Sequence, residues 1–414
     1  MDSDNFPGLL ENSDNFTLRR AVERLRDGLF DPFAIQLLTA REAQLNKVFD
    51  KGARQLAQNQ SPHLCICGSY GQGKSHSLTY IRERALEQGF VTSQVNLDPR
   101  EIPFHDFRQV YRALVSQIRF PGSDDTLVQC WQRWVGEREQ KVNLKNNMGL
   151  SECIPESMPH FFKSVLTALA QENIPLSRKQ KGLKKNVTFR PREFPWLLAS
   201  ALKGESLPVF RLRHALKYRQ VSFYKEASLV CRGWQPYFQA VASLGRMFQN
   251  MGFKGWVLLF DEGESIGQRP VNIRRKSYMI LDHCFSPTAP HSGIYPIFAF
   301  TDDFFVQVRS EDYERVYTKQ EQELTYFEKN YGQAWQHVNL YHLRDLAAKD
   351  WQDLTARLVR LHAEAYGWEP SLQEIADKMA EVMKATAGQE ARLKIKALVE
   401  QLDLGQQEVT NLNP

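Results

Sequence analysis

Apolar residues along the chain gather into short runs that are separated by longer stretches with helical spacing. The clearest runs lie at 63–67, 90–97, 256–260 and 294–300, and each is followed by glycine or by a polar residue. Largely apolar runs of this length are typical of strands buried on both faces of a sheet. The segments between them, beginning with TLRRAVERLRDGLF at 17–30, place apolar residues three and four positions apart, as amphipathic helices do. The pattern predicts an α/β fold in which helices flank a parallel sheet.

Two regions show mostly helical spacing. The first extends from Phe107 to Glu172, with turn residues near Pro121 and Asn146. The second begins beyond Tyr341 and contains three amphipathic segments in succession. We therefore expect a helical insertion within the α/β unit and a compact helical domain after it.

The run GSYGQGKS directly follows the first apolar run and matches the phosphate-binding pattern G-x-x-x-x-G-K-[ST] in full. Glycines let backbone N–H groups close around a phosphate, and the helix that begins at Lys74 directs its positive end toward it. We expect Lys74 to neutralise the β- and γ-phosphates of ATP and Ser75 to ligate Mg²⁺. The predicted nucleotide contacts are Gly68, Ser69, Tyr70, Gly71, Gln72, Gly73, Lys74, Ser75 and His76.

A second motif follows the run at 256–260, where Asp261 and Glu262 occupy the end of the predicted strand. Asp261 would hold the Mg²⁺ shell, and Glu262 would act as the general base toward the attacking water. A strand end with solvated acids is the alternative, but the presence of both residues argues for ATP hydrolysis. Thr301 ends the next run, where it could sense the γ-phosphate or orient the water.

Spacing in the sequence identifies less clearly the arginines that would neutralise charge in the transition state of hydrolysis. Arg309 and Arg315 follow Thr301 and could reach the γ-phosphate of a neighbouring subunit as fingers, which would require a homo-oligomer. Arg392 begins the last predicted helix and could reach the nucleotide from the helical domain. Surface ion pairing is the alternative for Arg309 and Arg315.

Composition indicates the cellular environment that we expect for the protein and leaves the predicted fold unchanged. Hydrophobic residues make up 42% and charged residues 24%, which is typical of a soluble globular protein. Neither a membrane span nor an apolar leader is predicted, so we expect no membrane association. The six cysteines match no zinc spacing, and Cys65 and Cys67 are expected to be buried strand residues, which fits a reducing cytoplasm.

Basic residues concentrate in one segment although the whole chain carries a net charge of only +5. Residues 171–235 contain fourteen Lys or Arg against four Asp or Glu. The densest part, 178–192, has seven basic residues and no acidic residue. Such a run can contact the phosphates of duplex or single-stranded DNA, or it can be a solvated loop, and no groove-reading helix is tied to it.

Together these segments resemble an AAA+ ATPase of the initiator-like branch. The carrying features are LTAREAQL, GSYGQGKS, WVLLFDE, FAFT and the helical tail, in that order. More narrowly, the chain is similar to a P-loop family of bacterial phage-defence islands that includes the BREX-type ATP-binding proteins. That similarity rests on RRAVERLRDGL, GSYGQGKSHSLTYI, VNLDPREIPFHDFRQVYRAL and GFKGWVLLFDEGES.

The resemblance implies an ATP-dependent component of a multi-protein system that acts on DNA together with other defence proteins. It assigns the Walker lysine to Lys74, the metal residues to Ser75 and Asp261, the acid to Glu262 and the sensor-1 position to Thr301. The family's sensor-2 arginine usually lies in a Pro-Arg-Glu pattern. Here Arg392 keeps the arginine, but its flanking residues are Ala391 and Leu393.

The expected architecture is therefore an AAA+-like P-loop fold with a helical insertion and a C-terminal helical lid. Its expected parts are a helical leader (1–35), the first part of the ATPase core (36–125), a helical and basic insertion (126–250), the second part of the core (251–340) and the lid (341–414).

Three functions fit this architecture. The leading one is an ATPase that couples hydrolysis to assembly or remodelling on nucleic acid within a defence complex. The second is a signalling switch or scaffold that binds ATP with little or no turnover. The third, a small-molecule kinase, fits the Asp261-Glu262 pair and the helical tail less well.

Overall fold

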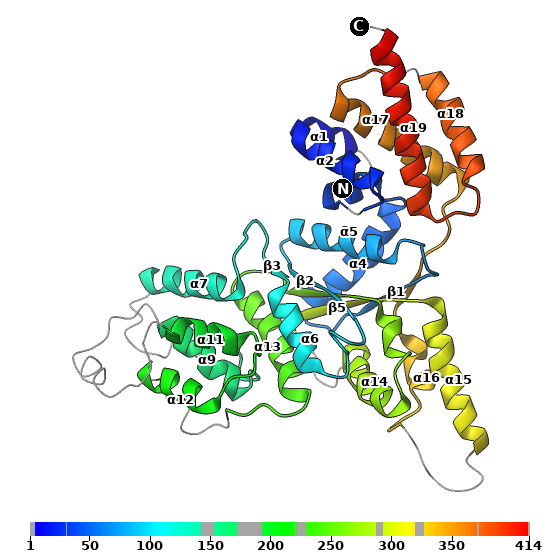
Figure 1. Cartoon of the computed structure of the whole chain (residues 1–414). Coiled ribbons are helices and arrows are strands. Elements are labelled where there is room, and N and C mark those ends of the chain that lie inside the picture. The colour runs from blue at the N-terminus through cyan, green and yellow to red at the C-terminus, as the bar shows by residue number, and fades with distance from the viewer. Residues whose placement is uncertain are drawn as a thin grey trace.

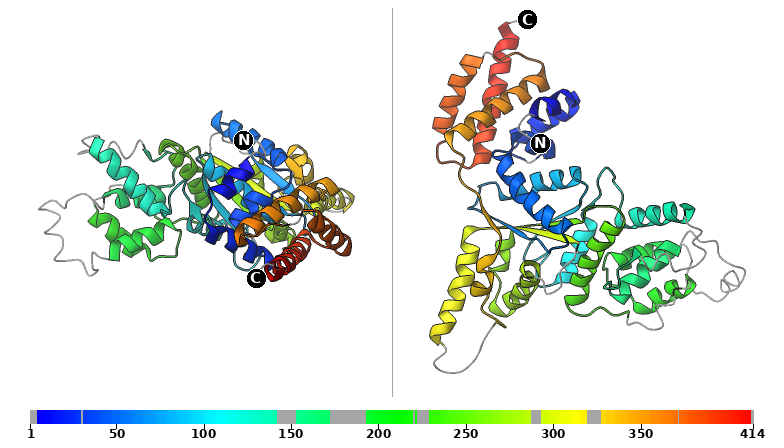
Figure 2. Two further views of the ribbon diagram at one scale, coloured as in Figure 1. Left: turned by 90° about the horizontal axis from the view of Figure 1, so that it is seen from above. Right: turned by 180° about the vertical axis from the view of Figure 1, so that it is seen from behind.

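The computed structural model describes residues 5–29, 31–141, 153–171, 193–219, 221, 229–286, 293–318, 327–370 and 372–412. A central sheet forms the middle of the molecule, and a group of helices extends from one end of the sheet (Figure 1). A second group of helices, built from the two ends of the chain, lies above the sheet in this view and in the view from behind (Figure 2). The predicted α/β class is confirmed.

Six strands of the described residues form one sheet, in the order β3-β2-β4-β5-β1-β6. Every neighbouring pair is parallel except β2 and β3. The register aligns Asn96 with Asp261, and it aligns Cys67 with both Phe300 and His342, so the parallel strands end at one edge of the sheet. The strands are β1 (Leu64–Cys67), β2 (Val91–Asn96), β3 (Ile118–Arg119), β4 (Trp256–Asp261), β5 (Ile294–Phe300) and β6 (Leu340–His342).

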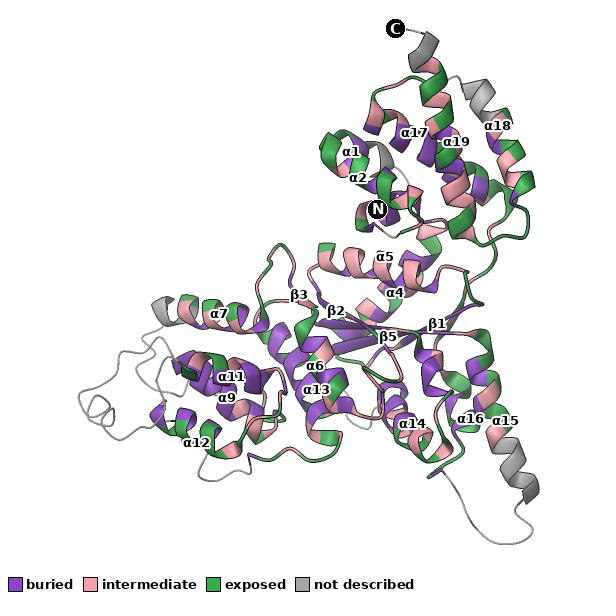
Figure 3. Cartoon of the chain, viewed as in Figure 1, coloured by how far each residue is buried: buried purple, intermediate pink, exposed green. Residues whose placement is uncertain are grey.

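Both faces of the sheet are covered by helices, which explains the continuous apolar runs in the sequence. The ribbon of the sheet is largely buried (Figure 3). Alternate residues of β4 enter different cores: Val257 and Leu259 pack on one face, and Leu258 and Phe260 on the other. The first face is covered by α4 (Glu42–Ala57) and α5 (Lys74–Glu87), and the second by α6 (Phe107–Ser116), α13 (Gln235–Asn250) and α14 (Val271–Phe285).

A helical insertion between α6 and α13 continues the core of the second face. Trp131 and Phe162 of the insertion are fully buried, and the Tyr111 hydroxyl of α6 donates a hydrogen bond of 2.6 Å to the Leu202 carbonyl. The basic run 178–192 lies outside the described residues. The insertion helices are α7 (Leu127–Lys141), α9 (His160–Ala170), α11 (Phe194–Leu202) and α12 (Val209–Tyr218).

Helices from the two ends of the chain share a third core. Ala21 and Val22 are buried together with Leu358, Leu398 and other apolar residues of the carboxyl-terminal helices. The first three helices therefore pack in one unit with the carboxyl-terminal helices. The predicted domain boundaries stay a prediction. The members of this unit are α1 (Asn5–Glu11), α2 (Asn15–Arg26), α3 (Pro32–Leu38), α17 (Ala348–Tyr366), α18 (Leu372–Ala385) and α19 (Ala391–Leu412).

Polar residues join the same unit. The Arg26 guanidinium donates to both carboxylate oxygens of Asp403, at 2.7 and 2.8 Å. The buried His362 ring lies beside this pair, with Nε2 3.0 Å from Asp403 Oδ1. Trp368 donates its indole N–H to Nδ1 of His362 at 2.9 Å, so Nε2 carries the proton and donates to Asp403.

Shorter elements complete the described chain: the 3₁₀ turns η5 (Gly263–Ile266) and η6 (Trp335–His337), and the helices α15 (Asp302–Thr318) and α16 (Tyr331–Ala334). Within the described ranges, no helix combines the length and the apolar composition that a membrane span requires.

The buried imidazole predicts a loss of stability on acidification. Burial lowers the pKa of His362, so the unfolded chain, with a histidine pKa of about 6.5, binds a proton that the folded chain excludes. His362 therefore contributes stability above about pH 6.5, and this contribution falls as the pH is lowered through that value. We expect the free energy of unfolding, measured with urea, to fall between pH 7.5 and pH 5.5.

His362→Gln should reduce this fall, whereas His337→Gln, at an exposed position, should keep the wild-type dependence. An unchanged fall in His362→Gln would exclude His362 as the source. Burial also lowers the pKa of His63 and His76, to about 4 each, so part of the fall should remain in either variant.

Candidate functional site

A glycine loop (residues 68–73) connects the end of β1 to the start of α5. Gly71 and Gly73 have φ angles of 81° and 90°, in the left-handed region where a side chain would strain the backbone. Gly73 is the N-cap of α5, which begins at Lys74. The start of a fourteen-residue helix therefore presents backbone N–H groups and the positive end of the helix dipole to an anion at the loop.

Lys74 is buried and is directed back into the loop. Its ammonium donates to the carbonyls of Gly68 and Ser69, at 3.0 and 3.2 Å. The Ser69 N–H in turn donates to Gln72 Oε1 at 2.7 Å. Several polar groups of the loop are thus bonded within the loop, and a bound phosphate would have to replace some of these bonds.

Two acidic residues follow β4 at the same edge of the sheet. Asp261 is half-buried, and its Oδ1 accepts the Glu262 N–H at 2.9 Å. Glu262 is exposed and has a φ of 55°, an unusual conformation for a residue with a side chain. Such strain is often concentrated at functional positions.

Thr301 follows β5, which is hydrogen-bonded between β1 and β4. Its position therefore falls between the glycine loop and Asp261. The next residue, Asp302, accepts a bond of 3.4 Å from the Ser69 hydroxyl and lies 3.3 Å from Nδ1 of His342. The ends of β1, β4, β5 and β6 thus contribute to one cluster of polar side chains.

Glu264 is a member of this cluster that the sequence pattern alone did not identify. It lies in η5, and its Oε2 is buried without a hydrogen-bond partner among the described residues. Burial raises the pKa of its carboxyl, Asp261 and Glu262 raise it further, and Lys74 lowers it. The spacing Asp-Glu-Gly-Glu was the available signal, because a single tight turn brings its third acid back toward the site.

The segments that precede α17 and α19 also contact the glycine loop. Gln72 donates to Asp345 Oδ1 at 2.8 Å. Glu390, next to the start of α19, lies so close to Gly71 that an added Cβ there would be 3.1 Å from its side chain. Arg41 donates to the Asp345 carbonyl at 3.0 Å and forms an ion pair with Asp350 of α17.

The remaining predicted contacts have different surroundings. His76 Nε2 lies 2.8 Å from the Thr39 hydroxyl, which donates to the Ile35 carbonyl. Burial lowers the pKa of His76 to about 4, so the ring is neutral and donates to Thr39, which ties α5 to α3. Tyr70, at the tip of the loop, is 84% exposed.

The three candidate arginines are on the surface or outside the described side chains. Arg392 is exposed, and its Cγ and Cδ lie about 3.6 Å from the position that a Cβ at Gly28 would occupy. Arg309 is exposed on α15, and the side chain of Arg315 lies outside the described residues. Their proposed roles stay predictions.

Magnesium is the metal that the sequence pattern predicts at this site. No group of three or more His, Cys, Asp or Glu side chains in the described part of the chain is arranged to hold a metal. Mg²⁺ instead binds through one or two protein oxygens and completes its shell with water and phosphate oxygens. Ser75, in the first turn of α5, and Asp261, at the end of β4, are the residues expected to supply these protein oxygens.

A family model described as BREX system ATP-binding protein BrxC/D matches residues 17–177 and 233–412 of the chain. These ranges include the glycine loop, both strand-end acids and the carboxyl-terminal helices. No curated protein and no solved structure matches the chain.

The environment of Glu264 predicts that this residue lowers stability. Its pKa is raised in the fold, so its ionisation above the unfolded value of about 4.3 opposes folding at neutral pH. We expect Glu264→Gln to raise the melting temperature by about 1–3 °C at pH 7.5, and this gain should shrink toward pH 4.5. Glu262→Gln, at an exposed position, should change it by less than about 1 °C.

Differential scanning calorimetry of the three proteins checks this expectation. A lower melting temperature for Glu264→Gln at pH 7.5 would mean that the buried carboxylate is a net stabilising acceptor.

Proposed function

The chain belongs to the family described as BREX system ATP-binding protein BrxC/D, and from this premise we propose that it is a Mg²⁺-dependent ATPase of the BREX phage-defence system. ATP would bind at an AAA+-like P-loop formed by Gly68 to Ser75. The observation that carries the proposal is the convergence of Lys74 and the Asp261-Glu262 pair at one edge of the sheet, on either side of β5.

Binding would exchange the internal bonds of the loop for bonds to phosphate. Lys74 would leave the carbonyls of Gly68 and Ser69 and neutralise the β- and γ-phosphates. Backbone N–H groups of the loop and of the first turn of α5 would hold the phosphate oxygens. Ser75 and Asp261 would hold the Mg²⁺, which screens the phosphate charge when it is bound.

Hydrolysis would depend on Glu262. Its exposed carboxylate would accept a proton from the attacking water while the water oxygen bonds to the γ-phosphorus, and the bond to the β–γ bridging oxygen would break to release ADP and phosphate. Thr301 would orient that water, since β5 lies between the two halves of the site. Arg392, or Arg309 or Arg315 of a neighbouring subunit, would neutralise the developing charge.

We also propose how ATP hydrolysis would be coupled to a change in the carboxyl-terminal helices. The contacts of Gln72 with Asp345 and of Gly71 with Glu390 link the loop to the carboxyl-terminal helices. These contacts support an ATPase that remodels a DNA-bound assembly with other defence proteins. They equally support a nucleotide-dependent switch or scaffold with little turnover, which is the alternative function.

Substitutions in the two motifs separate binding from turnover. Lys74→Ala removes a charge-assisted contact to phosphate and should weaken ATP binding by roughly ten- to a hundredfold. Glu262→Gln should bind ATP within about threefold of wild type but lower turnover by roughly 10²- to 10⁴-fold. Fluorescent-nucleotide binding and phosphate release, with and without duplex DNA, measure both quantities.

Glu381→Gln on α18 is the matched control and should retain wild-type values. Nucleotide binding by the wild type without turnover, whether or not DNA is present, would favour the switch or scaffold over the ATPase.

The basic run predicts a salt-sensitive interaction with DNA. Reversing the charge of Lys181, Lys184, Lys185 and Arg190 should weaken binding to duplex DNA and lower the salt slope by about 0.9 for each phosphate that is no longer neutralised. Fluorescence anisotropy between 50 and 200 mM salt checks both effects. Unchanged binding would identify the run as a solvated loop.

A further inference from the structure

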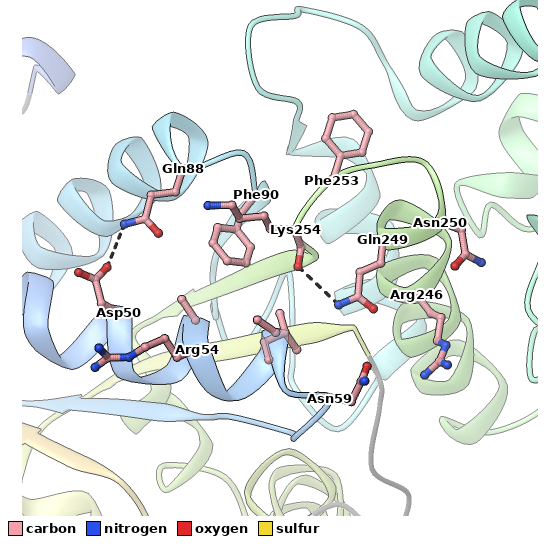
Figure 4. A pocket seen from close by; sticks show the side chains of 13 residues that line it. Asp50, Arg54, Asn59, Gln88, Phe90, Arg246, Gln249, Asn250, Phe253 and Lys254 are labelled. Carbon is pink, nitrogen blue, oxygen red and sulfur yellow. Dashed lines mark hydrogen bonds between the residues drawn. The ribbon is translucent and has the colours of Figure 1, made fainter.

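A cavity of about 730 Å³ opens at the edge of the sheet opposite the glycine loop. It is lined by the second half of α4, the start of β2, the end of α13 and the segment that leads into β4 (Figure 4). The glycine loop follows the carboxyl end of β1, whereas this cavity adjoins the amino ends of β2 and β4. The cavity is therefore separate from the proposed ATP site.

Aromatic and aliphatic side chains form the wall of the cavity. Phe90 and Leu56 are buried beneath it. The half-buried Phe253 lies at its rim, with its ring directed away from the other labelled side chains (Figure 4). This ring contacts Phe120 and Phe248. The ammonium of Lys254 lies 5.9 Å from the centre of the Phe90 ring. The apolar wall and the cation thus face the same space.

The charges around the cavity are predominantly positive. Arg54, Arg246 and Lys254 line it, and all three are exposed. Among the described residues, the one acid of the lining is Asp50, which already accepts a bond of 2.9 Å from Arg84 and another of 2.9 Å from Gln88. An anion that enters the cavity therefore meets cations rather than a free carboxylate.

Three helices end at the cavity, and this offers a structural explanation for the cations. The carboxyl ends of α4, α5 and α13 carry partial negative charge, which favours nearby basic side chains. However, backbone N–H groups already cap the last turns: Gln58 donates to the Arg54 carbonyl, Phe90 to Ala85, and Met251 to Met247. The basic side chains are consequently not required as hydrogen-bonding caps.

We propose that this cavity binds a nucleotide unit, either within a single strand of nucleic acid or as a free nucleotide. Arg54 and Lys254 would hold the phosphate, and the base would lie against the apolar wall, beside the exposed part of Phe253 at the rim. The side-chain amides of Asn59 and Gln249 also line the cavity. Gln249 Nε2 donates a bond of 3.5 Å to the Lys254 carbonyl, so its Oε1 is the atom that would meet a base edge. The site extends beyond the proposed ATPase function and does not depend on it.

An acidic peptide fits the cavity less well. Peptides that bind by strand addition need a free sheet edge, but β2 and β4 are each paired on both sides. Peptides that bind as helices need a long apolar groove, whereas here the apolar wall is interrupted by charged and amide side chains.

The test uses the full chain carrying Lys74→Ala, so that the glycine loop does not compete for nucleotide. A labelled oligothymidylate is titrated by fluorescence anisotropy, and a second oligonucleotide containing 5-iodouracil is photo-crosslinked and mapped by mass spectrometry. We expect crosslinks at Phe253 or its neighbours, and at least tenfold weaker binding in Arg54→Glu and in Lys254→Glu. Lys349→Glu, exposed on α17 and distant from the cavity, should bind within twofold.

Competition with thymidine monophosphate distinguishes the two sources of the ligand. If thymidine monophosphate displaces the labelled strand as well, per nucleotide, as unlabelled oligothymidylate does, the cavity is a free-nucleotide site. If it displaces the strand only weakly, the cavity is a strand-binding site. Both results support the proposal. Crosslinks confined to 178–192, equal binding by the cavity variants and the control, or displacement only by an acidic peptide would overturn it.

ATP turnover is the measurement that separates the cavity proposal from the ATPase proposal. In an otherwise wild-type chain, Arg54→Glu and Lys254→Glu should leave ATP turnover in the absence of nucleic acid unchanged. Absence of cavity crosslinks in the chain with an intact cavity, together with normal ATP turnover, would remove the cavity proposal alone. Cavity crosslinks in a chain that never turns over ATP would remove only the ATPase.

Discussion

The parallel pairing of β5 with both β1 and β4 is the constraint on which the rest of the site depends. Parallel strands that end in register bring their following residues to one edge, and this register places the glycine loop, Thr301 and Asp261 side by side. The pairing is possible only because both faces of these strands are apolar and covered by helices. The grouping of polar residues at this edge thus depends on the two cores, which bury alternate residues of each strand and so hold the strands in parallel register.

The parts of the site that sequence reasoning could predict are those specified by short segments. Glycines at positive φ, the helix start at Lys74 and the acids after an apolar run are local properties, so the α/β class and the strand–loop–helix arrangement followed from them. Glu264 was not recognised, because the burial of its Oε2 depends on packing that a sequence does not display. The contacts of Asp302 with Ser69 and of Asp345 with Gln72 join residues more than two hundred positions apart, and no spacing rule predicts them.

Arg41 shows how the carboxyl-terminal helices are held over the sheet. It adopts a left-handed backbone conformation at the start of α4, pairs with Asp350 and donates to the Asp345 carbonyl, while the Asp345 side chain accepts from Gln72. Asp345 therefore links the glycine loop to α4, because it accepts from Gln72 through its side chain and from Arg41 through its carbonyl. Arg41 in turn links α4 to α17 through its ion pair with Asp350. Gln72 and the helical unit are thus connected by hydrogen bonds that do not involve the strands of the sheet.

The shared core of the first and last helices has a consequence for synthesis. Ala21 and Val22 are buried against residues such as Leu398 and Leu402, about 380 positions later in the chain. At ribosomal rates of 5–20 residues per second, the early helices wait roughly 20–75 s before their packing partners exist. During that interval the α/β core can form while the apolar face of α2 remains uncovered. Completion of this unit is thus a late event in the synthesis of the chain.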